Sequence, residues 1–134
     1  MLRQLDDKTL ISGQIAPEDV AALKDEGVTM IVNNRPDGEE PGQPLGAEIE
    51  EAATAAGMDY RSIPIIRGIG PADAEAMREA LKQSRGNVLA FCRTGTRSAL
   101  TWALARSEEG LPRAEIEERL KNAGVDPTPI EHLL

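Results

Sequence analysis

Residues 88–98 read Val-Leu-Ala-Phe-Cys-Arg-Thr-Gly-Thr-Arg-Ser, and no other stretch says as much about the fold. The apolar run Val88–Phe91 predicts a buried central strand. Residues 98–106 predict a helix that is apolar nearly all round and is therefore buried as well. A short polar loop joins the two elements. Because ligands of open α/β sheets bind beyond the carboxyl ends of the strands, we expect a functional site at Cys92 and in the loop that follows it.

Apolar runs and helical patterns alternate on both sides of this stretch. Val28–Val32 predicts another strand that is buried on both faces, and residues 60–66 predict a further strand. Pro17 and Pro71 each fit the first turn of a helix. Gly27 fits the end of the helix that Pro17 begins, and Gly57 fits the end of another. The pattern predicts an α/β fold with a short, mostly parallel sheet flanked by helices, and residues 1–134 are expected to form one domain.

Composition argues against several classes of function. A net charge of −8 and only 2% aromatic residues disfavour a nucleic-acid partner, which needs a basic surface. No run of about 18 apolar residues could cross a membrane, and no apolar leader starts the chain, so we expect a cytoplasmic protein. The single cysteine and single histidine exclude a thiolate zinc cage and a histidine-rich metal site. No cofactor is implied.

The loop after Cys92 has the groups that an anion-binding site requires. Successive backbone N–H groups in a tight turn form an anion-binding nest, and the following helix adds its N-terminal partial charge. Gly95 permits a positive φ or a close approach of the backbone to a ligand. The expected anion-binding residues of the loop are Arg93, Thr94, Gly95 and Thr96.

Two further side chains complete the predicted catalytic group. Arg97 can bind an oxyanion through two parallel hydrogen bonds, and the Ser98 hydroxyl could donate to the sulfur of Cys92 or cap the helix. These surroundings stabilise a thiolate. A lone cysteine at a strand end is usually an inert, buried residue, but two arginines, two threonines and a glycine favour a nucleophile. We therefore predict that Cys92 is catalytic.

This loop, CRTGTRS, resembles the active-site loop of cysteine-dependent phosphatases and of rhodanese-type sulfurtransferases. A wider series of motifs resembles the phosphatase-like domain of the beta-lactamase hydrolase-like protein family over about residues 3–110. The resemblance implies a fold like that of dual-specificity phosphatases. Some members are fused to metallo-beta-lactamase-like or other sulfur-metabolism domains, which implies a sulfur-metabolism partner protein. The further motifs are Gly13-Gln14-Ile15, residues 32–39 (VNNRPDGE), Ala56-Gly57-Met58 and Ile63-Pro64.

The sequence departs from the phosphatase pattern in three places. Phe91 stands where phosphatases usually have histidine. Only four residues separate Cys92 from Arg97, one fewer than in phosphatases and as in rhodaneses. Ile66 and Arg67 occupy the place where many dual-specificity enzymes have an acid. A phosphate ester needs a proton for its leaving alkoxide, whereas sulfite or a thiolate leaves without one.

These departures favour a sulfurtransferase that works through a persulfide on Cys92. The alternative is a phosphatase, a hydrolase that passes through a phosphocysteine. A third hypothesis is a non-catalytic anion-binding or protein-interaction module. The substrate of either enzyme would be a small anion, a sulfane-sulfur donor or a phosphate ester.

A second candidate loop, residues 35–40, follows the strand Val28–Val32 and should lie on the same sheet edge as Cys92. Arg35 could add positive charge to the anion site, and Asp37 could act as the general acid that is missing after Ile65. The competing interpretation is a solvated turn, since Pro-Asp-Gly is a common turn sequence.

Overall fold

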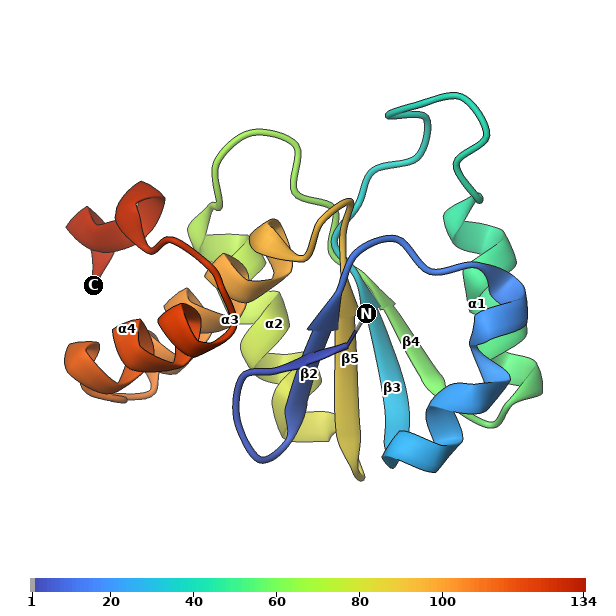
Figure 1. Ribbon diagram of the computed structural model, residues 1–134, viewed down its shortest axis with the longest axis horizontal. Helices are drawn as coiled ribbons and strands as arrows, with labels where there is room; N and C mark the ends of the chain where they lie inside the picture. Colours follow the sequence, from blue (N-terminus) through green and yellow to red (C-terminus); the bar gives the residue numbers. More distant parts are fainter. Residues whose placement is uncertain (1) are drawn as a thin grey trace.

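The computed structural model describes residues 2–134 and contains a five-stranded sheet with helices on both faces (Figure 1). The strand order is β1-β2-β5-β3-β4, and every neighbouring pair is parallel except β1 and β2. The predicted α/β fold with a mostly parallel sheet is confirmed. The strands are β1 (Arg3–Gln4), β2 (Thr9–Ser12), β3 (Val28–Asn33), β4 (Asp59–Ser62) and β5 (Asn87–Phe91).

The helices divide between the two faces of the sheet (Figure 1). One face carries α1 (Gly46–Ala55) with the 3₁₀ helices η1 (Pro17–Asp19) and η2 (Ala21–Glu26). The other carries α2 (Pro71–Gln83) and α3 (Thr96–Glu108), and α4 (Arg113–Asn122) and η3 (Thr128–Leu133) pack on the outside of α3. Within residues 2–134, no helix combines the length and apolar character that crossing a membrane requires.

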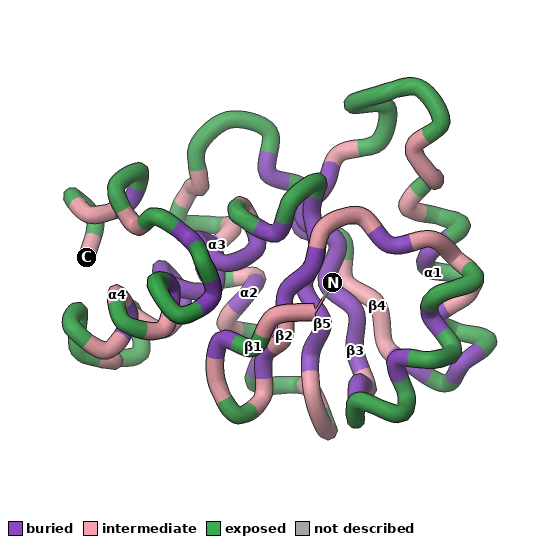
Figure 2. Tube along the Cα trace, viewed as in Figure 1, coloured by how far each residue is buried: buried purple, intermediate pink, exposed green. Residues whose placement is uncertain are grey.

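Alternate residues of the central strands enter two separate cores, one on each face of the sheet. On β3, Met30 and Val32 pack toward α2 and α3, whereas Ile31 packs toward α1. This alternation follows from the period of two along a strand. Helix α3 is covered by the sheet, α2 and α4, and its Trp102 is fully buried, as the all-round apolar pattern predicted (Figure 2).

Two elements differ from the sequence-based expectation. The predicted helix after Pro17 consists of the 3₁₀ helices η1 and η2, and Gly27 ends the second with a φ of 75°. The strand expected over residues 60–66 ends at Ser62, because Pro64 has no N–H to donate to a ladder. The chain still follows the end of β3, since the N–H of Ile65 donates to the carbonyl of Asn34 at 2.9 Å. That path brings the carbonyl of Ile65 to the site described below.

Candidate active site

The Cys92 loop leaves β5 at the carboxyl edge of the sheet and is held there by hydrogen bonds to its carbonyl groups. The carbonyl of Arg93 accepts from the backbone N–H of Gln14 at 3.3 Å. The carbonyl of Thr94 accepts from the Arg3 guanidinium at 2.6 Å. Gly95 follows with a φ of 96°, a conformation that favours glycine. The surrounding chain therefore fixes the direction of the peptide groups in the loop.

The sulfur of Cys92 lies beneath this loop and is fully buried. The N–H of Gly95 donates to it at 3.1 Å. The pKa of Arg97 is raised above its ordinary value. The main cause is the hydrogen bond with Glu39, and the charge of a thiolate at Cys92 adds to the effect. A backbone donor thus contacts the sulfur, and the Arg97 guanidinium lies near enough to interact with it. A cysteine placed in this way can serve as a nucleophile.

Ser98 lies in the first turn of α3 and is also fully buried. Its hydroxyl oxygen has no hydrogen-bond partner among the residues that the structure describes. The predicted bond from Ser98 to the sulfur is therefore absent from this structure. A buried hydroxyl without a partner is uncommon in native proteins, so this group is available to a charge that develops beside it.

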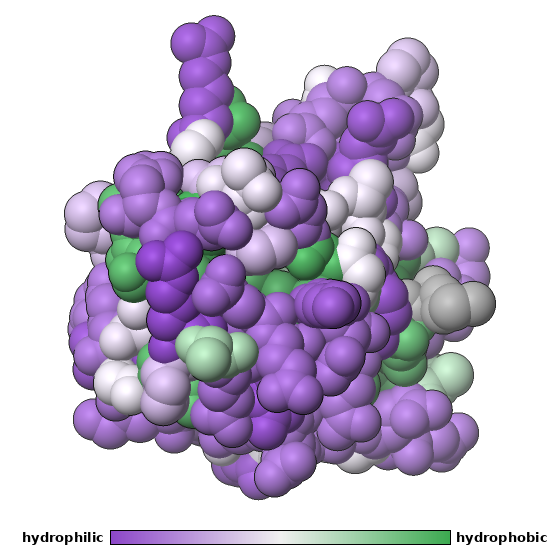
Figure 3. All heavy atoms as spheres, turned by 60° about the vertical axis from the view of Figure 1, so that its left-hand side comes forward, coloured by the Kyte–Doolittle hydropathy of each residue, from purple (hydrophilic) through white to green (hydrophobic). Residues whose placement is uncertain are grey.

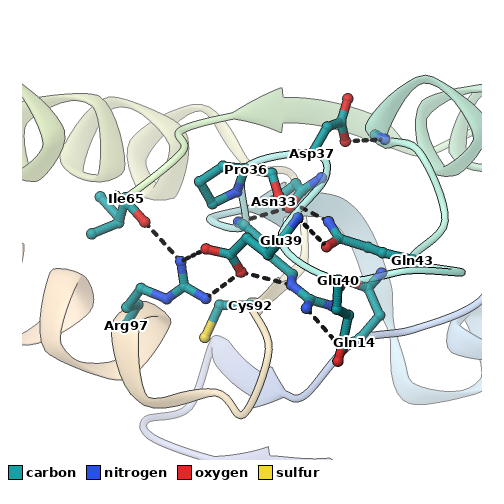
Figure 4. A network of polar contacts seen from close by, with 12 residues as sticks. Gln14, Asn33, Pro36, Asp37, Glu39, Glu40, Gln43, Ile65, Cys92 and Arg97 are labelled. Carbon is teal, nitrogen blue, oxygen red and sulfur yellow. Dashed lines mark hydrogen bonds and ion pairs between the residues drawn. The ribbon is translucent and has the colours of Figure 1, made fainter. Parts of the chain in front are cut away.

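Arg97 makes the most extensive polar contacts of the site (Figure 4). One terminal nitrogen donates to Oε2 of Glu39 and to the carbonyl of Ile65, each at 2.8 Å, and the other donates to Oε1 of Glu39 at 2.8 Å. This bidentate geometry is the one in which arginine binds a planar oxyanion. The bonds from Arg97, supported by Arg35, lower the pKa of Glu39 to about 2.

Arg35 is brought to the same place, with its side chain almost completely buried. Its three nitrogens donate to Glu39 at 2.8 Å, to Glu40 at 2.8 Å and to the side-chain oxygen of Gln14 at 3.0 Å. An open cavity of about 470 Å³ is lined by Arg35, Glu39, Glu40, Arg93 and Arg97. The structure thus places Arg35 beside Arg97, but each nitrogen of the Arg35 guanidinium already donates to a side chain of the protein.

Asp37, the predicted general acid, has a different partner. Its Oδ1 accepts the N–H of Gly46 at the start of α1, at 2.8 Å. In Figure 4 it points away from Cys92, toward that N–H group. Asp73, the next carboxylate after Arg67, likewise accepts the N–H of Gly70 at the start of α2, at 2.8 Å. The position of Asp37 therefore does not support a role in proton transfer at Cys92, because its carboxylate caps a helix.

The remaining predicted residues lie on the outer side of the loop. Arg93, Thr94 and Thr96 are exposed. The Thr94 hydroxyl donates to the Thr96 hydroxyl at 3.2 Å, which stiffens the turn that leads into α3. Arg93 nevertheless lines the same cavity as Arg35 and Arg97. Among the predicted residues, Cys92, Gly95, Arg97, Arg35 and Arg93 are thus brought together, and Asp37 is not.

Four important residues are missing from the sequence-based set. Glu39 accepts hydrogen bonds from both Arg35 and Arg97. Gln14 and Arg3 donate to carbonyl groups of the loop. Gly13 leaves room for the loop, since a Cβ on Gly13 would lie 2.8 Å from the carbonyl of Arg93. The sequence held two signals: Glu39 lies in the candidate loop of residues 35–40, and Gly13 and Gln14 belong to the motif series of the resemblance. No local pattern marked Arg3.

Residues 1–109 match the family described as "Beta-lactamase hydrolase-like protein, phosphatase-like domain". Two curated relatives carry the name beta-lactamase hydrolase-like protein. The chain is 38% identical over 125 residues to that of Agrobacterium fabrum, covering 92% of this chain and 29% of the relative. It is 36% identical over 115 residues to that of Xylella fastidiosa, covering 84% of this chain and 27% of the relative. The chain thus spans less than a third of these relatives.

A crystal structure from Neisseria meningitidis, described as a "putative phosphatase", has a TM-score of 0.81 and 37% identity to this chain, covering 97% of this chain and 91% of the other. PTPMT1 is 17% identical with a TM-score of 0.75, and the alignment covers 99% of this chain and 91% of PTPMT1. At that identity the similarity shows the fold alone. The expected cysteine-phosphatase-like fold is confirmed.

Proposed function

The chain belongs to the family of phosphatase-like domains of beta-lactamase hydrolase-like proteins, and we propose that it is a thiolate enzyme whose nucleophile is Cys92. The observation that carries this proposal is the Gly95 N–H that donates to the buried sulfur at 3.1 Å, in a loop that leads directly to Arg97 and the polar cavity that Arg97 lines. Arg97 orients the substrate oxyanion, and Ser98 supports the thiolate when it reforms. The backbone of Arg93, Thr94, Gly95 and Thr96 cradles the anion, and Arg35 adds charge to the cavity.

The first candidate reaction is hydrolysis of a phosphate monoester. The Cys92 thiolate attacks phosphorus, an S–P bond forms, and the bond to the leaving oxygen breaks. Water then attacks the phosphocysteine, which releases inorganic phosphate and restores the thiolate. The family and the N. meningitidis relative support this reaction. The comparisons thus favour the phosphatase alternative over the sulfur transfer that the loop length favoured.

Sulfur transfer stays the second candidate because a specific feature of the site favours it. No carboxylate is placed as a proton donor: Asp37 and Asp73 cap helices, and the pKa of Glu39 is about 2, so Glu39 is ionised at neutral pH. In this reaction the thiolate attacks the outer sulfur of a donor such as thiosulfate. A new S–S bond forms, the S–S bond of the donor breaks, and sulfite leaves with the electron pair. An acceptor thiolate then takes the sulfur from Cys92.

The two reactions leave different groups on Cys92, so intact-protein mass spectrometry distinguishes them. The protein is incubated briefly with an aryl phosphate, with thiosulfate or with glutathione persulfide, and quenched in acid. A gain of one phosphoryl group establishes the phosphatase, and a gain of one sulfur atom establishes the sulfurtransferase. Cys92→Ser is the control that should take up neither. If no donor modifies Cys92 and turnover is absent, the domain is an anion-binding module without catalysis.

A further inference from the structure

An apolar cavity of about 400 Å³ opens beside Arg97 on the side away from Glu40. Its walls come from the segment after β4, from α3 and from η3, and they include Ile65, Ile66, Ile69, Leu100, Ile130 and Leu133. Arg97 lines both this cavity and the polar cavity that holds Glu39 and Arg35. One side chain therefore separates an anion-binding space from an apolar one.

The apolar surface continues past this cavity. A smaller cavity of about 190 Å³ shares Ile69 and Leu133 with it and extends over Pro71, Ala74 and Leu104. Figure 3 turns this side of the molecule forward and shows apolar surface in hollows between polar side chains. Ile66 is 76% exposed and Leu133 is 52% exposed. Exposed apolar side chains that line a hollow next to an active site are typical of a ligand-binding surface.

We propose that these two cavities form a subsite for the apolar part of the substrate, and that the substrate is an oxyanion joined to an unbranched alkyl chain. The inference rests on the proposed function, because it requires the anion at Arg97 and the Cys92 loop. The arginine shared by the polar and apolar cavities lets one ligand occupy both. The succession of two adjoining apolar cavities fits an extended chain better than a single compact ring.

The polar side chains define how such a ligand is oriented. Arg97 lines both the larger apolar cavity and the polar one, so it fixes the charged head between them. The chain then passes over Ile69 and Leu133, where it removes apolar surface from water on both partners. Affinity should therefore rise with chain length, whichever group the enzyme transfers.

The test uses n-alkylphosphonates from ethyl to octyl, because their C–P bond resists both proposed reactions. Isothermal titration calorimetry is expected to show affinity rising by up to about fourfold for each added methylene that becomes buried. Leu133→Asn should flatten this dependence while ethylphosphonate binds as in the wild type. Leu45→Asn is the matched control: Leu45 is also 52% exposed but lies outside both cavities, so the chain-length dependence should be unchanged.

Each contrary result has a distinct meaning. Equal affinity for ethyl- and octylphosphonate in the wild type overturns the subsite and leaves the proposed function standing. The subsite is overturned in the same way if Leu133→Asn instead changes the oligomeric state in size-exclusion chromatography, because a second copy would then cover this surface. If no phosphonate binds at any length, the proposed function fails and takes the subsite with it.

Discussion

The carboxylate of Glu39 occupies both terminal nitrogens of Arg97, with two hydrogen bonds of 2.8 Å each. Glu39 also accepts from Arg35 at 2.8 Å, so one carboxylate joins the loop after β3 to the first turn of α3. An oxyanion bound by the fork of Arg97 would take the place that Glu39 now holds. Under the proposed function, Glu39 is therefore an internal competitor for the substrate.

Glu39→Gln should tighten the binding of inorganic phosphate about tenfold, because a neutral amide competes less well for the Arg97 fork than a carboxylate does. Isothermal titration calorimetry at neutral pH measures this directly. The matched control is Glu40→Gln, which removes an ion pair from Arg35 but leaves Arg97 untouched. Weaker phosphate binding in Glu39→Gln alone would mean that Glu39 positions Arg97 for the substrate instead of competing with it.

Cys92→Ser should abolish turnover and leave the fold intact. The hydroxyl is slightly smaller than the thiol, and it is a far weaker nucleophile at neutral pH. Activity is measured with the substrate that modifies Cys92 in the mass-spectrometric experiment, and circular dichroism checks the fold. Turnover close to that of the wild type would remove Cys92 from the mechanism.

Arg97→Lys should lower kcat/KM on the order of 10²-fold, since lysine keeps the charge and loses the bidentate fork. Arg97→Ala should be worse, because the charge is lost as well. Steady-state kinetics of both variants beside the wild type measure the difference. Wild-type kinetics in Arg97→Lys would show that Arg97 acts only as a general positive charge.

The stability of the protein should fall in acid partly because of Glu39. The hydrogen bonds from Arg97 and Arg35 hold the pKa of Glu39 at about 2, below its ordinary value of 4.5. Its stabilisation is therefore fully present above pH 4.5 and is lost as the pH falls toward 2. Between pH 6 and pH 3, the free energy of unfolding measured by urea denaturation should fall by about 1 kcal/mol less in Glu39→Gln than in the wild type. The difference is modest because solvent screens the ion pair. Identical pH profiles would contradict this prediction.

One inserted residue should shift the balance between the two candidate reactions. A glycine placed between Thr94 and Gly95 gives the loop the phosphatase length, so phosphate-ester hydrolysis should rise and sulfur transfer should drop. Adding Arg67→Asp to that variant should raise hydrolysis further, by up to about 10²–10⁴-fold for a well-placed acid. Both activities are assayed in the wild type and in each variant.

The same assays test the remaining prediction about Asp37. Its carboxylate caps α1, so Asp37→Asn should leave phosphate-ester hydrolysis close to that of the wild type. If the wild type hydrolyses phosphate esters efficiently and Asp37→Asn depresses that activity alone, the loop of residues 35–40 supplies the acid despite the contact with Gly46.

Local patterns in the sequence were enough to place Cys92, the loop after it, and the strand and helix that the loop joins. The apolar run before Cys92, the apolar helix after it and the polar loop between them are such patterns, and burial enforces each of them wherever the chain folds compactly. The α/β class followed from the same periodicity. Cys92, the glycine turn and Arg97 also lie within six residues, so their proximity needed no knowledge of the fold.

Long-range packing decided which other residues contact the Cys92 loop and Arg97. Glu39 lies 58 residues from Arg97, and Arg3 lies 91 residues from Thr94. These contacts depend on how the loop after β3 and the strand β1 are placed against the Cys92 loop. The same is true of Asp37, whose carboxylate could face the thiol or cap α1, and of the apolar cavity, which is assembled from three separate segments. Polar loops have no periodic burial to constrain them, so their partners become known only when the whole chain is folded.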